Sequence, residues 1–241
     1  MKWNCISILL FITLGCSCQI KEEKTADVPI KGETKVIEIS ALEKQMINAG
    51  LMNVQEKEPG IIVELKYSTT DNFLNTDVYG TLENAYLQPD VLIKLQKAYQ
   101  YLITKDSSLT FIIYDATRPV SVQQKMWDIV QENYPEKSKY VSNPKNGSLH
   151  SYGAAVDITI GNKKGEALDM GTPYDFFGEA AEPQLENILL ANGTLTEIQI
   201  QNRKILRDVM VKAGFIQLPS EWWHYNSCSR EDVKKIYKIL E

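Results

Sequence analysis

The sequence has little excess charge of either sign and few of the residues that build cross-linked or cysteine-bound metal sites. Its 241 residues include 26 Lys and Arg, 31 Asp and Glu, 4 Cys and 2 His. The net charge of -5, without a run of like charges, provides no basic stripe to neutralise phosphates, so nucleic acid is not expected as a partner. No C-x-x-C spacing occurs, which excludes the common cysteine-based zinc motifs.

The apolar run nearest the N-terminus, Ile6 to Leu14, is too short to span a bilayer comfortably. It follows Lys2 and precedes Gly15 and Cys16, an order typical of an export signal. The segment resembles a bacterial lipoprotein signal with Cys16 as the lipidated residue, and Cys18 is a second candidate. We therefore expect an exported protein of the cell envelope that a lipid anchor attaches to the membrane. A plain secretory signal or a membrane anchor is the alternative.

After processing at Cys16, the three remaining cysteines do not form a disulfide framework, so the fold must depend on its hydrophobic core. A hydrophobic share of 44% is ordinary for a globular protein. The expected organisation is a signal in residues 1–16, a polar tether and N-terminal extension in 17–59, and one catalytic domain in 60–241. Nothing in the sequence indicates an oligomeric state.

The expected strands and helices alternate without regular crossover spacing. Apolar and β-branched runs predict strands at 61–67, 109–116, 154–160 and 221–227. Helical spacing predicts helices at 90–103, 121–134 and 196–215, with Ser121 as an N-cap and Gly214 as a stop. This irregular mixture favours an α+β fold with a central, mainly antiparallel sheet flanked by helices.

The only two histidines, His150 and His224, are candidate partners of Asp157, which lies within an apolar strand. An unpaired carboxylate at such a position is costly, and metal ligation or an ion pair would offset the cost. Two imidazoles and one carboxylate form a common catalytic zinc site with an open fourth position. A lone histidine is more often a hydrogen-bonded structural residue, so residue type alone leaves both interpretations open.

Glu221 stands three residues before His224, and a carboxylate beside a metal-bound water is the usual general base in peptide hydrolysis. The spacings within each pair, seven residues from His150 to Asp157 and three from Glu221 to His224, are odd. In one regular strand an odd spacing places two side chains on opposite faces. We therefore expect His150 in the loop before its strand and Glu221 in the turn after Pro219.

Four separated segments resemble those of the zinc D-alanyl-D-alanine dipeptidases of peptidase family M15. They are LKYSTTDNF (65–73), YDATRPVSVQ (114–123), SLHSYGAAVDITI (148–160) and EWWHY (221–225). The last two match the patterns S-x-H-x-x-G-x-A-x-D and E-x-W-H. The resemblance extends over residues 61–225. It implies hydrolysis of the dipeptide D-Ala-D-Ala to two D-alanines, with one zinc ion per chain bound at the sheet.

The resemblance also implies a role for each matching residue. The zinc ligands are His150, Asp157 and His224. Glu221 takes a proton from water and passes it to the leaving amine, and Arg118 stabilises the oxyanion. The substrate-binding residues are Asp175, which anchors the free ammonium group, Tyr67 and Ser148.

Several of these residues also have a purely structural interpretation. Without the resemblance, Arg118 would be interpreted as a surface residue paired with Asp115, and Asp175 as a turn cap. Trp222 and Trp223 are interpreted as packing residues. An exported dipeptidase cannot deplete an intracellular dipeptide pool, so the expected role is recycling or scavenging of wall-derived dipeptide. The alternatives are a D,D-carboxypeptidase acting on longer peptidoglycan peptides and a non-catalytic binding lipoprotein.

Overall fold

The computed structural model describes residues 39–130 and 141–241, which belong to one compact unit, Glu38–Glu241. The predicted signal and its candidate lipidation sites, Cys16 and Cys18, lie outside the described residues. Among the helices of the described ranges, none is both long and apolar enough to cross a membrane.

A five-stranded sheet with the order β2-β4-β5-β7-β6 forms the centre of this unit. Its strands are β2 (Ile62–Val63), β4 (Leu109–Asp115), β5 (Ala155–Asn162), β6 (Ile216–Gln217) and β7 (His224–Asn226). β2 pairs with β4 in parallel, and the other three pairs are antiparallel. The predicted α+β fold with a mainly antiparallel sheet is therefore confirmed. A separate antiparallel pair joins β1 (Met52–Asn53) to β3 (Tyr86–Leu87).

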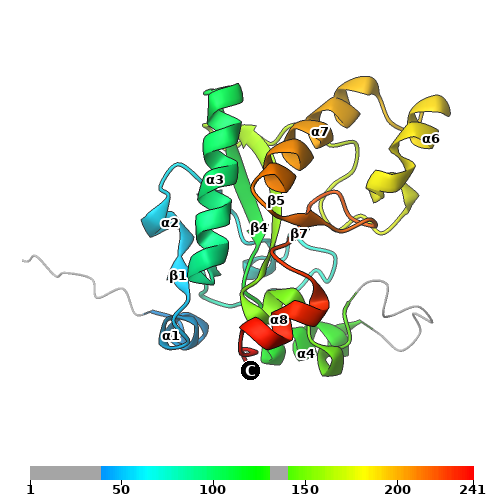
Figure 1. Cartoon of the computed structure of the whole chain (residues 1–241). Coiled ribbons are helices and arrows are strands. Elements are labelled where there is room, and N and C mark those ends of the chain that lie inside the picture. The colour runs from blue at the N-terminus through cyan, green and yellow to red at the C-terminus, as the bar shows by residue number, and fades with distance from the viewer. Residues whose placement is uncertain (1–38, 131–140) are drawn as a thin grey trace, which may run out of the picture. The chain divides into compact units, whose positions relative to one another are not determined.

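Two long helices, α3 (Pro89–Lys105) and α7 (Glu197–Lys212), pack on each other and on β4 and β5 (Figure 1). α7 begins with a capping box formed by Thr196 and Gln199. It ends shortly before Gly214, whose positive φ of 94° suits the predicted stop. The remaining helices are α1 (Ala41–Asn48), α2 (Val54–Lys57), α4 (Val120–Ile129), α6 (Glu186–Ala191) and α8 (Arg230–Ile236).

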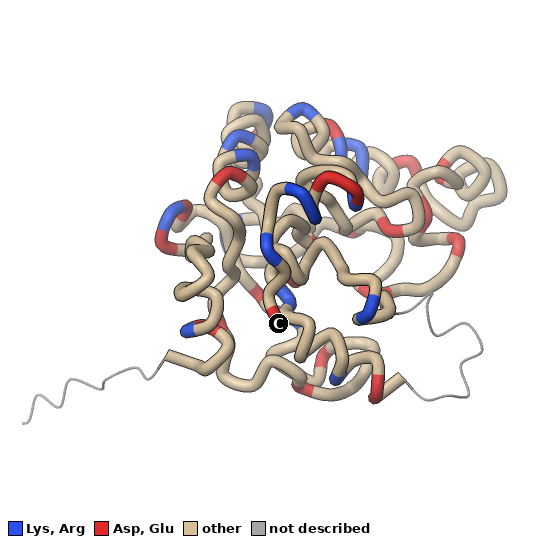
Figure 2. Tube along the Cα trace, turned by 60° about the horizontal axis from the view of Figure 1, so that its bottom comes forward, with Lys and Arg blue, Asp and Glu red and all other residues tan. Residues whose placement is uncertain are grey.

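Charged residues of both signs are interspersed along the chain (Figure 2). Several form exposed pairs, such as Lys204 with Asp208 and Lys235 with Glu231. Exposed pairs contribute little to the free energy of unfolding. The hydrophobic core contributes far more, because central strand residues such as Ile113 are fully buried.

The strand expected at 221–227 is reduced to β7, and two other predicted elements also differ locally from the structure. The expected strand at 61–67 is reduced to β2, because the chain turns into a 3-10 helix, Lys66–Ser68, that carries Tyr67. The helix expected at 121–134 is α4, and its N-cap is Pro119 rather than Ser121. Pro119 has an extended ψ of 154°, and its carbonyl accepts hydrogen bonds from the next turn, which leaves Ser121 inside the helix. Residues 131–134 lie outside the described residues.

The compact unit begins earlier than the predicted boundary at residue 60. α1 and α2 lie within the segment assigned to the tether and N-terminal extension, yet Met46, Leu51 and Val54 belong to the hydrophobic core. Both helices are capped by side chains, Ser40 for α1 and Asn53 for α2. Residues 41–57 are therefore part of the folded unit rather than a segment outside it.

Candidate active site and metal centre

Three side chains with metal-ligating atoms converge beside β5 and β7. His150 Nε2, His224 Nδ1 and Asp157 Oδ1 form a triangle with edges of 2.9, 3.2 and 3.4 Å. These three residues are buried, and their ligating atoms are close enough for one metal ion. The structure therefore brings together the three predicted ligands.

Local structure positions His150 outside the strand that carries Asp157. His150 lies in the 3-10 helix η3 (Leu149–Tyr152), whose N-cap is Ser148 and whose C-cap is Gly153. Gly153 has a left-handed backbone, with φ of 67°, and a Cβ there would lie 2.7 Å from Leu51. The glycine permits the sharp turn into β5, as the odd spacing requires. His150 Nδ1 lies 2.5 Å from the Ala116 carbonyl, which directs Nε2 toward the other ligands.

Strand register aligns the other two ligands. Asp157 in β5 is the direct partner of His224 in the neighbouring strand β7. The second ring nitrogen of His224, Nε2, lies 2.9 Å from Asn226 Oδ1. Since an amide oxygen accepts hydrogen bonds, Nε2 donates to Asn226, and Nδ1 is the nitrogen that faces the cluster and can bind a metal ion once it is deprotonated.

The geometry of the three donors fits a small four-coordinate cation. With bonds of about 2.0–2.1 Å, two ligands of a tetrahedral zinc ion are about 3.3 Å apart. The observed edges lie between 2.9 and 3.4 Å. Each imidazole is also held by a hydrogen bond at its outer nitrogen, as ligating histidines are in metalloproteins. Three protein donors leave one tetrahedral position open.

The ligand cluster has the electrostatics of a charged pair. Burial alone would raise the pKa of Asp157, but the charge and hydrogen bond of His150, together with those of His224, hold it well below its usual range. Burial lowers the pKa of His224, whereas the hydrogen bond and charge of Asp157 raise it, with a net value of about 9. The buried carboxylate therefore pairs with the His224 imidazolium, and a metal ion would displace the proton on Nδ1 when it binds.

Glu221 lies beside the ligand cluster in the irregular segment that precedes β7. Its Oε2 is 4.0 Å from His224 Nδ1, and a quarter of its side chain remains exposed. Burial raises the pKa of Glu221, the charge of His224 lowers it, and the charge of Asp157 raises it, so the net pKa is raised. A carboxylate at this distance, with a raised pKa, is suited to exchange protons near the open metal position.

Arg118 is buried and pinned rather than exposed on the surface. Its Nε donates to Asp115 Oδ2 at 2.9 Å, its Nη2 donates to the same oxygen, and its Nη1 donates to Gln123 Oε1 at 3.0 Å. The guanidinium also lies over the Tyr67 ring, and its Nη2 is 3.9 Å from Asp157 Oδ2. Its partner Asp115, expected on the surface, is fully buried and fixes this charge beside the candidate metal ligands.

Asp175 occupies an irregular loop that faces the same site. Its φ of 59° lies in the left-handed region, at a cost of about 1 kcal/mol or more for a non-glycine residue. Tyr67 donates its hydroxyl to Asp175 Oδ2 at 2.9 Å. Burial and the charge of Asp157 raise the pKa of Asp175, and the hydrogen bond from Tyr67 partly opposes this. The Asp175 carboxylate is therefore buried on a strained backbone, and a residue that only caps a turn needs neither feature.

All eight predicted site residues line one cavity of about 380 Å³. Ser148 lies at the wall of this cavity and is also the N-cap of η3. Trp223 lines this cavity too, although it is 2% exposed and belongs to the core. Trp222 lies in the same core, and its Nε1 donates to Thr172, so packing is the main role of both tryptophans.

Sequence reasoning missed several residues that support the site. Tyr79 and Asp115 share a hydrogen bond of 2.5 Å behind Arg118, and Tyr174 donates to Asp157 Oδ2 at 2.9 Å. Gln123 and Asn226 orient Arg118 and His224, respectively. The sequence had already suggested Asp115 as a partner of Arg118, and Gln123 lies in the same YDATRPVSVQ segment, so its proximity to Arg118 was a usable signal. Nothing in the sequence around Tyr79 or Tyr174 indicated that these residues contact the site.

Comparison with known proteins gives relatives over most of the compact unit. The chain is 31% identical over 167 residues to the D-alanyl-D-alanine dipeptidase of Escherichia coli (strain K12), covering 69% of this chain and 79% of that protein. It is 30% identical over 191 residues to the D-alanyl-D-alanine dipeptidase of Enterococcus faecium, covering 73% of this chain and 90% of that protein. The solved structure of VanYB in complex with D-Alanine-D-Alanine is similar with a TM-score of 0.36 and 18% identity, covering 64% of this chain and 77% of that one.

The family assignment follows from the sequence match. Residues 47–238 match the profile of the M15 peptidase family described as D-ala-D-ala dipeptidase. The matched range contains all eight residues of the candidate site and begins within α1. The chain therefore belongs to the D-Ala-D-Ala dipeptidase family of M15 metallopeptidases.

Proposed function

We propose that this protein hydrolyses the free dipeptide D-Ala-D-Ala to two D-alanines with the help of one zinc ion. One observation carries the proposal: three convergent ligands, a nearby carboxylate, a fixed guanidinium and a second carboxylate all line the same cavity. The names of the relatives supply the substrate. The cavity of about 380 Å³ falls in the size range of small-molecule sites.

His150 Nε2, Asp157 Oδ1 and His224 Nδ1 would hold the zinc ion, since their mutual distances and outer hydrogen bonds fit a tetrahedral cation. When bound, zinc supplies Lewis acidity and lowers the pKa of a coordinated water. Asp157 offers its other oxygen, Oδ2, to the Tyr174 hydroxyl, which restrains the carboxylate so that Oδ1 faces the histidines.

Glu221 accepts a proton from the attacking water and delivers it to the nitrogen of the leaving D-alanine. Its raised pKa brings the carboxylate closer to neutral pH, where one group can both accept and release a proton. Arg118 provides a fixed positive charge for the oxyanion of the tetrahedral intermediate. Since Asp115 and Gln123 already hold the guanidinium in place, little reorganisation is needed when the negative charge develops.

Asp175 pairs with the free ammonium group of the substrate, and Tyr67 orients that carboxylate. A buried carboxylate built to pair with an ammonium penalises substrates that lack one. N-blocked and longer peptides are therefore poor substrates. Ser148 contributes its hydroxyl to the wall on which the dipeptide binds.

A panel of peptides tests the proposal. Zinc-loaded protein is incubated with free and N-acetylated D-Ala-D-Ala and with L-Ala-L-Ala, and released alanine is measured. The expected result is turnover of the free D,D-dipeptide far above that of the other two. Cleavage of the N-acetylated peptide at a similar rate would favour a D,D-carboxypeptidase, and stoichiometric binding without turnover would indicate a binding protein.

We further propose that the protein is an exported lipoprotein of the cell envelope, anchored at Cys16, that recycles or scavenges wall-derived dipeptide. The support is the order of Lys2, the apolar run and Gly15-Cys16 in the sequence. Metabolic labelling with a radioactive fatty acid tests the anchor. We expect labelling of the wild type and of Cys18→Ser, whereas Cys16→Ser should remain unlabelled. Labelling of Cys16→Ser would contradict Cys16 as the lipidation site.

A further inference from the structure

The loop that carries Asp175 is tied to α7 by three side chains on one helix face. Gln199 Nε2 donates to Asp169 Oδ2 at 2.8 Å, and Asn202 Nδ2 donates to the Asp169 carbonyl at 2.9 Å. Arg203 Nε donates to the Met170 carbonyl at 2.6 Å. Residues 199, 202 and 203 are three and four positions apart, so they project from the same side of the helix.

Arg203 also binds the other end of the loop. Its Nη2 donates to the Ala180 carbonyl at 2.8 Å, so one guanidinium bridges Met170 and Ala180, on either side of Asp175. The planar guanidinium reaches the two carbonyls through two different nitrogens, which fixes the direction of each bond. A lysine has only one nitrogen on a flexible stem, so it would not impose the same geometry on both carbonyls.

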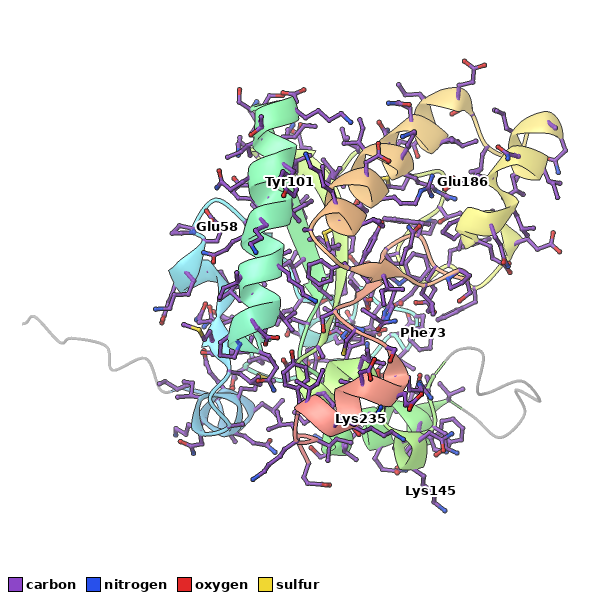
Figure 3. The ribbon with its side chains drawn as sticks, in the orientation of Figure 1. Glu58, Phe73, Tyr101, Lys145, Glu186 and Lys235 are labelled. Atoms are coloured by element: carbon purple, nitrogen blue, oxygen red, sulfur yellow. The ribbon has the colours of Figure 1, made fainter. Side chains whose placement is uncertain are left out.

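A contribution to the free energy of unfolding does not by itself explain why an arginine is buried at position 203. Arg203 is fully buried, and its Nη1 makes no hydrogen bond within the described residues, lying 3.9 Å from Glu186 Oε1. Glu186, the first residue of α6 (Figure 3), accepts two hydrogen bonds from Arg207 instead. Well-packed apolar residues often stabilise a fold as much as a buried ion pair does. The geometry that Arg203 imposes on the loop is the more specific consequence.

The loop needs such support because its backbone is irregular and strained. Asp175 has a left-handed φ of 59°, and this conformation persists only where the surroundings enforce it. Inside the loop, Thr172 accepts from Trp222 and Tyr174 donates to Asp157. The bridge made by Arg203 encloses these contacts and fixes both ends of the segment.

We propose that Arg203 is a positioning residue that selects substrates with a free amine, because it clamps both ends of the 170–180 loop and so holds Asp175 in the site. This inference rests on the proposed function, in which Asp175 pairs with the ammonium group. Arg203 is not among the residues that line the 380 Å³ cavity, so it acts through the loop.

The test compares Arg203→Lys with the wild type, both in a Glu221→Ala background that prevents turnover. Calorimetry measures the Kd for free D-Ala-D-Ala on zinc-loaded protein. We expect the Kd to rise about 10-fold or more, because a misplaced Asp175 loses a charge-assisted hydrogen bond to the ammonium. The Kd for N-acetyl-D-Ala-D-Ala, which has no ammonium, should change less than about twofold. Equal Kd values for the free dipeptide would overturn the inference.

Asn202→Ala guards against a folding defect in Arg203→Lys, because Asn202 is partly exposed and anchors the same loop at Asp169. It should weaken binding of the free dipeptide in the same selective way but to a smaller extent. The matched control is Lys204→Ala, since Lys204 pairs with Asp208 on the exposed side of α7 and should leave both Kd values unchanged. A shift equal to that of Asn202→Ala in this control would overturn the inference.

Amide hydrogen exchange tests the clamp independently of the proposed function, because it needs no substrate. Without any substrate, residues 170–180 should exchange faster in Arg203→Lys than in the wild type, while β4 and β5 should retain their protection. Unchanged exchange in the loop would overturn the clamp. If the wild type binds no dipeptide while loop exchange rises as expected, the proposed function fails and the clamp remains.

Discussion

Removing the side chain of Asn226 should weaken metal binding without unfolding the protein. In the structure Asn226 Oδ1 lies 2.9 Å from His224 Nε2, and this contact selects the tautomer whose Nδ1 faces the other ligands. Loss of a partner that orients a ligating histidine typically costs about 10–100-fold in metal affinity. Asn226 is partly exposed, so water can replace its oxygen, and we expect a loss near the lower limit, about 10-fold.

The assay is a competition for zinc between the protein and a chromophoric chelator at fixed pH. Asn226→Ala should show the weaker zinc affinity, whereas Asn226→Asp keeps an oxygen acceptor and should bind zinc at least as tightly as the wild type. The melting temperature of the metal-free protein should be nearly the same for all three. Wild-type zinc affinity in Asn226→Ala would refute the assignment of Nδ1 as a ligand held in place by Asn226.

Three further perturbations give distinct outcomes. Because burial raises the pKa of Glu221, and the base must be deprotonated, kcat/KM should fall with decreasing pH at a higher pH than an ordinary carboxyl would give; a pH–rate profile flat through the acidic range would contradict this. Arg118→Lys loses the three-nitrogen contact with Asp115 and Gln123, so kcat should drop about 100-fold or more in steady-state kinetics, and an unchanged kcat would exclude the oxyanion role. Met46→Ala, at a fully buried core position in α1, should lower the free energy of unfolding in urea by about 2–5 kcal/mol, whereas a neutral effect would place α1 outside the folded unit.

The convergence of the three candidate ligands could be predicted from the sequence because the signals for it are local. Only two histidines exist, Asp157 interrupts an apolar strand, and the odd spacings specify which residues must leave the strand. The structure places His150 in η3 and Glu221 before β7, as those spacings require. The family resemblance then suggested roles for Arg118 and Asp175, for which local sequence alone favoured ordinary roles.

The supporting residues could not be predicted, because they act through tertiary contacts. Tyr174 and Asp157 are 17 residues apart, and Arg203 and Met170 are 33 residues apart; nothing in either local sequence indicates the pairing. The boundary at residue 60 was misplaced for the same reason. α1 and α2 are short, and Met46 and Val54 became core residues through packing against distant segments.

The most direct test of the account is release of D-alanine from D-Ala-D-Ala by the same protein preparation before chelation, after chelation and after zinc is restored, with Glu221→Gln measured alongside. We expect turnover that chelation abolishes and that one equivalent of zinc per chain restores, while zinc-loaded Glu221→Gln binds the dipeptide but releases almost no D-alanine. Absence of turnover by the zinc-loaded wild type, or full activity of Glu221→Gln, would contradict it.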